Sequence, residues 1–449
     1  MKKILLFLCA AFFSSGFAFA DVAVTVYNSD RALVRESRDI SLKKGIQTLE
    51  FDNVSSKIDA TSVLPKFMSE PSKIKVLEQN FDYDLVSRDK LLSKYIGKKI
   101  EVERVGEDKR AKASGILLSV AGGVVLQTES KIILNPAGEI SMRELPENLR
   151  LKPTLSWLVA SQTEGANKME ISYQTSGLSW NADYVLVTDE KDENADITGW
   201  VTINNRSGAT YKDAKLKVIA GDVNTLPQPR AVNRMAELKS ASGFLQEDDS
   251  FVEKSFYEYH IYELQRKSTI KDNEVKQIEF ISANKIPVKK VLKYEAVKNN
   301  KVTVNLEFKN AVENNLGVPL PKGRVRVCKY DGDSLEFVGE NYIDHTAKNA
   351  NISIYTGNAF DVSAERIRTN YKEISSKSFE ESYKITLKNA KNEDVEVVVV
   401  ELLNDWANWT IFENSVKYEK TDSKTAEFKV KVPKEGEAVL TYKIKYAWK

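Results

Sequence analysis

Apolar and polar residues alternate over short stretches of this chain, and this alternation restricts the possible fold more than any other feature. Residues 22–27 alternate in this way, and residues 169–174 and 440–448 repeat the pattern far downstream. Successive side chains of a β-strand point to opposite faces of a sheet, so a period of two is typical of strands with one buried face. The sequence therefore predicts a mainly β protein with little helix, built as multi-domain antiparallel β-sandwiches.

Changes in this pattern divide the chain into three predicted domains that follow a short leader at 1–20. The N-terminal β domain covers 21–165 and contains a small SH3-like barrel as an insertion at about 98–145. The central β domain covers 166–310, with a flexible loop at about 226–253 that is marked by proline, glycine and acidic residues. The C-terminal β-sandwich domain covers 311–449.

One short helix is expected at 85–96, just before the small barrel. Leu85, Leu92 and Ile96 can share one face of such a helix, and Gly97 ends it.

The first twenty residues have the pattern of a secretory signal. Lys2 and Lys3 precede an uncharged apolar run at 4–13, and Ala18 and Ala20 are the small residues that a signal peptidase recognises. The run is too short to span a bilayer as a helix, and no later stretch reaches the length of a spanning helix. We therefore expect a periplasmic or secreted protein that is cleaved after Ala20 and has no transmembrane helix in the mature chain.

Loss of this leader would leave a neutral chain with a single cysteine. The formal net charge of +2 includes Lys2 and Lys3, so their removal takes it to zero, and removal of Cys9 leaves only Cys328. An intramolecular disulfide is then excluded. The interspersed charges give no field that would favour nucleic acid, so no nucleic-acid partner is expected.

Six phrases are more particular than generic β sequence, among them GLSWNADY at 177–184. The phrases lie at 77–85, 177–184, 205–224, 316–326, 343–346 and 357–362. Together they resemble a family of exported bacterial proteins catalogued as a domain of unknown function (number forty-one thirty-nine), distantly related to mucoidy-inhibitor-A-like proteins. The resemblance implies a secreted or periplasmic β-rich protein, with no assigned activity, cofactor or catalytic residue.

Most forms of catalysis that can be recognised in a sequence are excluded here. His260 and His345 are the only histidines, so a zinc site built from several histidines cannot form. The chain has no Gly-Lys-Ser/Thr phosphate loop, no dinucleotide glycine fingerprint and no Gly-x-Ser-x-Gly elbow. No metal site and no cofactor are expected.

The remaining catalytic candidates are Asp344 and His345, with Asp361 and Glu365 about one strand later. If adjacent strands bring them together, a carboxylate could orient His345 as a base, or the oxygens could hold a hard cation. The favoured interpretation is that these polar residues satisfy turns at strand ends, which is their commoner use.

Two groups of aromatic residues are candidates for ligand binding. Tyr257 and Tyr259 would share one face of a strand, and Trp406 and Trp409 form a second group. Exposed rings of this kind stack on sugars or peptides because each has an apolar face. Cross-strand packing and core filling are the commoner uses of such residues and are favoured here.

The sequence therefore predicts a non-catalytic exported envelope protein that acts by binding or assembly. An envelope protein or a polysaccharide is the expected partner, held by strand addition or by the aromatic residues. The alternative is a hydrolase or binding module that acts on envelope glycan or peptide, with carboxylates near His345 and Asp361.

Overall fold

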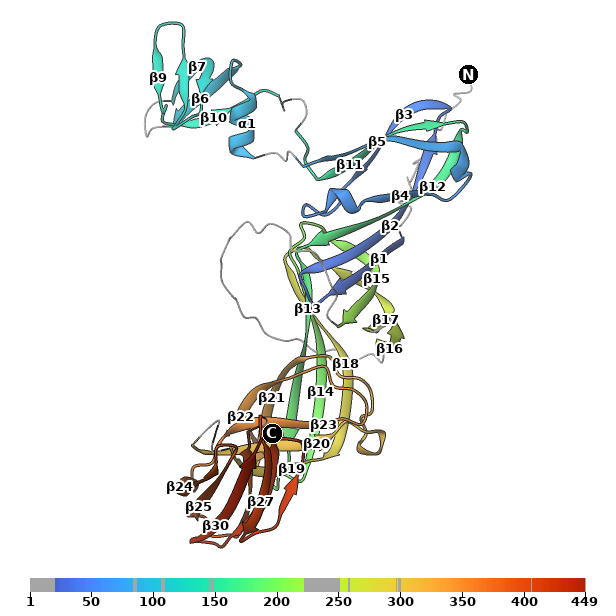
Figure 1. Cartoon of the computed structure of the whole chain (residues 1–449). Coiled ribbons are helices and arrows are strands. Elements are labelled where there is room, and N and C mark those ends of the chain that lie inside the picture. Colours follow the sequence, from blue (N-terminus) through green and yellow to red (C-terminus); the bar gives the residue numbers. More distant parts are fainter. Residues whose placement is uncertain are drawn as a thin grey trace, which may run out of the picture. The chain divides into compact units, whose positions relative to one another are not determined.

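β-strands form almost all of the regular structure (Figure 1). The computed structural model describes residues 21–83, 87–105, 110–144, 146, 149–221, 251–256, 259–295, 297, 300–404 and 406–448. In these ranges there is one α-helix, α1 (Arg88–Lys94), and three short 3-10 turns, η1 (Ala60–Ser62), η2 (Pro71–Lys73) and η3 (Val312–Asn314). The prediction of a mainly β fold is confirmed. The leader and most of the predicted loop at 226–253 lie outside the described residues.

The chain forms two compact units, each built from three separate segments. The first unit comprises Met1–Ser179, Asn204–Lys217 and Arg266–Glu274. The second comprises Trp180–Ile203, Val218–Gln265 and Val275–Lys449. The predicted domain boundary at 310 falls inside the second unit, because strands on both sides of it pair within the same sheets.

Two sheets contain the N-terminal strands. The seven-stranded sheet has the order β16 (Phe251–Phe256), β17 (Tyr259–Ile270), β15 (Tyr211–Ala220), β1 (Asp21–Tyr27), β2 (Arg31–Leu42), β12 (Gly165–Ser176), β4 (Leu64–Phe67). The three-stranded sheet has the order β3 (Gly45–Asp52), β11 (Thr154–Ser161), β5 (Ile74–Asp82). Alternation works as predicted in β1, where Val22, Val24 and Val26 are buried. In the smaller sheet Phe51 and Trp157 meet edge to face at 5.5 Å.

The segment predicted to be an SH3-like barrel contains a third, five-stranded sheet. Its order is β10 (Glu139–Ser141), β6 (Lys99–Val105), β7 (Arg110–Ser119), β8 (Val125–Gln127), β9 (Ile132–Leu134). Helix α1 begins after Ser87, whose hydroxyl accepts a hydrogen bond from the amide of Lys90. Leu92 and Tyr95 pack into the core of this sheet.

The predicted helix needs one correction, which concerns its buried face. Ile96 is 48% exposed, and Tyr95 takes the buried position instead. The α-helix ends at Lys94, so the chain has already left the helical repeat at Ile96, and Gly97 follows with a φ of +80°. Leu85 lies outside the described residues.

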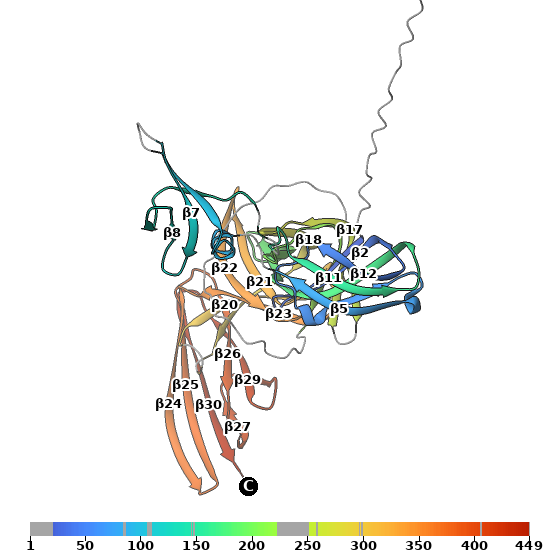
Figure 2. The ribbon, with the colours of Figure 1, turned by 90° about the horizontal axis from the view of Figure 1, so that it is seen from above.

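The second unit contains three sheets, and many of their strands are labelled in Figure 2. The first, sheet E, has the order β18 (Glu274–Pro287), β14 (Asn194–Asn205), β13 (Leu178–Thr188), β21 (Gly323–Asp331), β22 (Ser334–Ile343). Sheet F has the order β23 (Asn351–Asn358), β20 (Val302–Lys309), β19 (Lys289–Tyr294), β26 (Val395–Leu402), β29 (Thr425–Val432), β28 (Tyr418–Lys420). Sheet H has the order β24 (Val362–Ser375), β25 (Ser378–Asn389), β30 (Gly436–Ala447), β27 (Asn408–Asn414).

Sheets F and H share one core, and β26 lies in the middle of sheet F. Val397 and Val399 belong to the large core that also contains residues of β25 and β30. Val398 and Val400 pack with Val291 on the opposite face of the strand. Because both of its faces are buried, β26 has a continuous apolar run in place of an alternating one.

The described strands include two parallel pairs, which an arrangement of antiparallel sandwiches does not predict. β13 pairs with β21, and β19 pairs with β26. The first pairing begins at Gly323, where a Cβ atom would lie only 2.2 Å from the carbonyl oxygen of Ala182. Glycine is therefore required at the point where these two strands approach each other.

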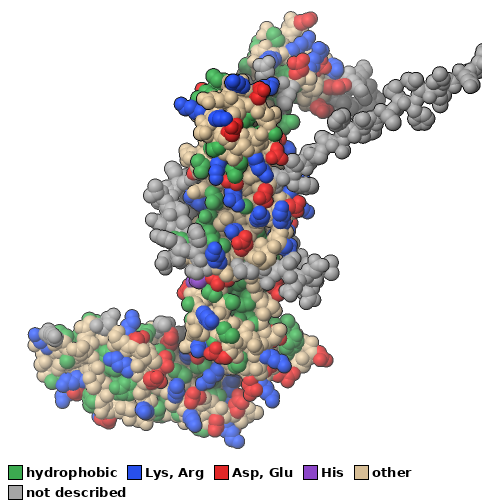
Figure 3. Space-filling view, turned by 90° about the vertical axis from the view of Figure 1, so that its right-hand side faces the viewer, with side chains coloured by type: hydrophobic (Ala, Val, Ile, Leu, Met, Phe, Trp, Pro, Cys, Tyr) green, Lys and Arg blue, Asp and Glu red, His purple; other side chains and the backbone are tan. Residues whose placement is uncertain are grey.

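In the described part of the chain, no helix has the length and apolar character needed to cross a bilayer. On the face shown in Figure 3, basic and acidic side chains are interspersed.

Tyr211 provides a pH-dependent contribution to the stability of the first unit. Its side chain is buried, its hydroxyl lies 3.1 Å from that of Ser207, and burial raises its pKa to about 12. Because the proton is held more tightly in the folded state, the full contribution is present below about pH 10 and is lost as the pH rises through about 12. A shift of two units corresponds to about 2–3 kcal/mol.

We expect Tyr211→Phe to remove this part of the alkaline loss of stability. The measurement is the urea midpoint at about pH 9 and about pH 12 for the native protein and the variant. Equal alkaline losses in the two proteins would contradict the assignment to Tyr211.

Candidate functional site

Five aromatic side chains gather at one end of sheet H. We call them the aromatic cluster, and they are Tyr371, Phe379, Trp406, Tyr446 and Trp448. Phe379 lies at the centre, with ring centroids 5.5 Å from Tyr371, 6.2 Å from Trp406, 4.9 Å from Tyr446 and 5.9 Å from Trp448. Trp406 also contacts Trp448 edge to face at 5.2 Å.

Strand register brings these residues together from four parts of the sequence. β25 and β30 are antiparallel, and their pairing places Phe379 directly opposite Tyr446. Tyr371 comes from β24, the edge strand on the other side of β25. Trp406 comes from the connection between β26 and β27, and Trp448 follows the end of β30.

The cluster has two exposed rings above a buried base. Tyr371 is 52% exposed and Trp406 is 57% exposed, whereas Tyr446 is 3% exposed. The planes of Trp406 and Tyr446 differ by only 19°, and those of Phe379 and Trp406 by 32°. Trp406 is therefore held by packing nearly parallel to the rings beneath it, which limits the entropy that it loses when a ligand binds.

A polar group borders the aromatic cluster. The Arg368 guanidinium lies 5.5 Å from the centre of the Tyr371 ring and donates a 2.8 Å hydrogen bond to Glu381. Glu381 also accepts a 2.8 Å hydrogen bond from the hydroxyl of Tyr383. Burial, together with the charge of Glu381, raises the pKa of Tyr446, and burial followed by this hydrogen bond raises that of Tyr383. Both phenols are therefore uncharged at neutral pH.

Of the two predicted tryptophans, the structure leaves only Trp406 available to a ligand. Trp409 is 9% exposed, and its indole N–H donates a 2.7 Å hydrogen bond to the carbonyl of Ser423. The Lys420 ammonium lies 4.3 Å from the centre of the Trp409 ring. Trp409 therefore fills the core and joins a turn to it, which is the commoner use of such a residue.

The structure describes only part of the predicted tyrosine face. Tyr257 lies outside the described residues. Tyr259 is half-buried and packs against Gly221, where an added Cβ would lie 2.4 Å from the ring. The neighbouring His260 contacts Glu253 at 2.7 Å.

The structure does not bring the predicted catalytic residues together. Asp344 and His345 are exposed, and His345 Nδ1 accepts a hydrogen bond from the amide of Lys322. Ile343, just before them, pairs with Gly323 at the beginning of β21.

Asp361 lies near the other end of β21. It lines a cavity together with Lys329, which is six residues beyond Gly323. A strand of that length separates the two positions by about 20 Å. Glu365 is exposed on β24. The carboxyl group of Asp361 is therefore too distant to orient His345.

Sequence reasoning missed Tyr371, Phe379, Tyr446 and Trp448. Tyr446 and Trp448 lie two residues apart in an alternating strand, so their common face could have been found from the sequence. Tyr371 and Phe379 join them only because β24 and β25 pair in one particular register.

A family model described as Domain of unknown function (DUF4139) matches residues 169–449. This range contains the whole aromatic cluster and five of the six phrases that carry the resemblance, while the phrase at 77–85 lies outside it. No curated protein matches the chain.

Proposed function

The chain belongs to the DUF4139 family, and we propose that it is a non-catalytic, exported protein of the cell envelope that binds polysaccharide on its aromatic cluster. The observation that carries this proposal is the pair of half-exposed rings, Tyr371 and Trp406, above a buried aromatic base. The leader pattern at 1–20 supports export.

A sugar ring suits the aromatic cluster better as a ligand than an ordinary protein surface does. The C–H face of a pyranose is apolar and packs on the negative face of an aromatic ring, while the hydroxyls at its rim need hydrogen-bond partners. The rings of the aromatic cluster offer the apolar faces, and Arg368 offers donors at the border. Two exposed rings separated by Phe379 suit consecutive sugars of an extended chain.

The test is the affinity of Trp406→Ala for soluble envelope oligosaccharides, measured by isothermal titration calorimetry. Removal of one stacking ring costs about 1–3 kcal/mol in nucleic-acid complexes that use the same contact, so we expect binding to weaken about tenfold or more. Phe412→Ala is the matched control, because Phe412 is 50% exposed on β27 and has no part in the aromatic cluster.

Several outcomes decide against the proposal. Equal affinities of the two variants would place the sugar elsewhere, and no binding of any oligosaccharide would remove polysaccharide as the ligand. An extended peptide that binds independently of Trp406 would favour strand addition along the edge strand β24. Release of shortened oligosaccharides would favour a hydrolase.

A further inference from the structure

A cavity of about 330 Å³ lies in the second unit and is lined by residues of sheets E and F and of the connections that follow β23 and β25. We call it the Asp192 pocket. Its charged lining residues are Asp192, Lys290, Lys329, Asp361 and Lys391. Its volume is at the lower end of the range of small-molecule sites, roughly 300–1,000 Å³.

Asp192 is held in place by the turn between β13 and β14. The Asp189 carboxylate accepts hydrogen bonds from the amides of Glu193 (2.9 Å) and Asn194 (3.1 Å), which closes the turn. Asp192 has a φ of +58°, in the left-handed region that few residues other than glycine, asparagine and aspartate adopt. The turn therefore presents the Asp192 side chain in a defined orientation.

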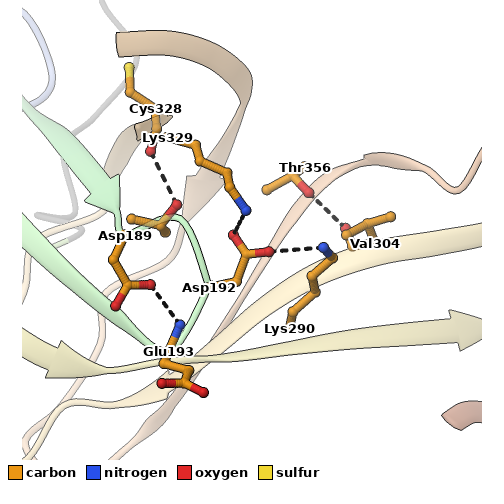
Figure 4. Close-up of polar contacts among 9 residues, drawn as sticks. Asp189, Asp192, Glu193, Lys290, Val304, Cys328, Lys329 and Thr356 are labelled. Atoms are coloured by element: carbon orange, nitrogen blue, oxygen red, sulfur yellow. Dashed lines mark hydrogen bonds and ion pairs between the residues drawn. The ribbon is translucent and has the colours of Figure 1, made fainter. Parts of the chain in front are cut away.

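Two lysines share the single carboxylate of Asp192 (Figure 4). Lys329 Nζ lies 2.7 Å from one oxygen and Lys290 Nζ lies 2.9 Å from the other. The Asp192 side chain is only 12% exposed, and those of Lys329 and Lys290 are 30% and 42% exposed. Two partly exposed ammonium groups and one largely buried carboxylate leave a net charge of +1.

The two other charged residues do not change this balance. Asp361 and Lys391 carry opposite charges, so the whole lining has a net charge of +1. A carboxylate carries one negative charge and matches this balance. A phosphate monoester carries about −1.5 to −2 at neutral pH and exceeds it.

Two β-bulges direct side chains into the Asp192 pocket. The pairing of β21 with β22 skips Val338, and the pairing of β20 with β23 skips Thr356. Both skipped residues line the pocket. Bulges redirect a side chain at the expense of regular pairing and are frequent beside binding sites, so two of them, one in each sheet, indicate a built site.

The remaining lining is mainly apolar. Leu292, Val304, Leu306 and Val327 contribute side chains from three strands. Phe360 also lines the pocket and is 99% exposed, so its ring is available to cover a bound molecule. Such a surface favours a ligand whose charged end is attached to an apolar body.

We propose that the Asp192 pocket binds the carboxylate of a small ligand with an apolar body, namely an apolar amino acid residue with a free carboxyl group. The two lysines on Asp192 bind the carboxylate, and the apolar lining contacts the side chain. The residue can be a free N-acylated amino acid or the last residue of a peptide. This inference does not depend on polysaccharide binding, because it involves none of the residues of the aromatic cluster.

The test is calorimetric titration of the full-length protein with N-acetyl-leucine and with N-acetyl-leucinamide, which lacks the negative charge. We expect the acid to bind and the amide to bind at least about tenfold more weakly, because the amide cannot pair with the lysines. A peptide that ends in leucine, with a free or an amidated carboxyl group, shows whether the ligand is a free amino acid or a chain end.

Two variants test the role of the charges in opposite directions. Lys329→Met keeps the stem but removes one ammonium group, and we expect a loss of about tenfold in affinity for the acid. Asp192→Asn removes the competing carboxylate and keeps a residue that tolerates positive φ, so we expect tighter binding of the acid at low salt. Lys388→Met, on an exposed lysine of β25, is the control that leaves binding unchanged.

These variants also separate binding from folding. If Lys329→Met loosens the turn, the gain in Asp192→Asn still reports on the lysines, and circular dichroism shows whether each variant remains folded. Absence of binding by either compound, equal binding of acid and amide, or loss of binding in Asp192→Asn would each overturn the proposal.

Discussion

Replacement of Glu401 by glutamine is expected to destabilise the second unit by about 3 kcal/mol or more. Glu401 lies on β26 with its side chain fully buried, and its two oxygens accept hydrogen bonds of 2.9 and 3.0 Å from Arg366. Removal of one partner of a buried ion pair leaves an uncompensated charge in a medium of low dielectric, which costs about 3–5 kcal/mol.

The contacts of Arg366 hold its side chain in place, so we do not expect movement of this side chain to restore the stability that is lost in Glu401→Gln. Its guanidinium lies 3.7 Å from the centre of the Tyr383 ring and donates a 3.3 Å hydrogen bond to the Tyr442 hydroxyl. Burial by itself would lower the pKa of Arg366, but the attraction of Glu401 outweighs it and the pKa is raised. Arginine is not deprotonated in proteins, so Arg366 stays charged in the variant although the attraction of Glu401 is lost.

Hydrogen exchange of peptides that cover β25 and β26 measures this effect, because it reports on the local stability of the second unit. Glu437→Gln is the control: its partner is Lys388, both side chains are more than half exposed, and such pairs contribute about 0–1 kcal/mol. The double replacement Arg366→Met with Glu401→Leu is expected to recover most of the stability, because it removes both charges. Equal exchange in Glu401→Gln and Glu437→Gln would contradict the prediction.

Asn205→Ala is expected to produce the second large effect, a loss of about 3 kcal/mol in the stability of the first unit. The Asn205 side chain is fully buried, and its amide donates 2.9 Å hydrogen bonds to the carbonyls of Ala209 and Lys271. Its carbonyl oxygen accepts hydrogen bonds from the amide and the hydroxyl of Ser207. Each buried group left unpaired costs about 1–3 kcal/mol, and alanine would leave several.

The matched control for this prediction is Asn414→Ala, which removes a hydrogen bond of the same kind to the carbonyl of Val416 at an exposed position. We expect a change of less than about 1 kcal/mol there, because water replaces the lost partner. Urea unfolding of both variants measures the difference, and hydrogen exchange of residues 205–211 shows whether the loss is local. A loss at Asn205 no larger than that at Asn414 would show that water reaches this turn.

Much of the strand content could be predicted from the sequence. The strands β1, β12, β13 and β15 were predicted from alternating apolar and polar residues, because the burial of one face of a strand imposes a period of two. The short helix was found, although its buried face was assigned to Ile96 and not to Tyr95, because the α-helix ends at Lys94. Helix ends depend on capping contacts that periodicity does not show.

The pairing of strands could not be predicted in the same way. The parallel pairs of β13 with β21 and of β19 with β26 join segments more than 100 residues apart. Alternation reports which face of a strand is buried, but it contains no information about which strand lies beside it. The Asp192 pocket depends on such pairings, since its two bulges appear only when the register of each pair is known.

In the aromatic cluster, Trp406 follows the very apolar segment that forms β26, and this sequence context favoured a position in the core. Only the tertiary structure decided that Trp406 is exposed and Trp409 is buried, because neighbouring elements cover one ring and leave the other at the end of sheet H. The sequence by itself determined a mainly β chain, since that property follows from local side-chain periodicity. Both candidate sites were decided by the tertiary structure, because each consists of residues that only long-range strand pairing brings within contact.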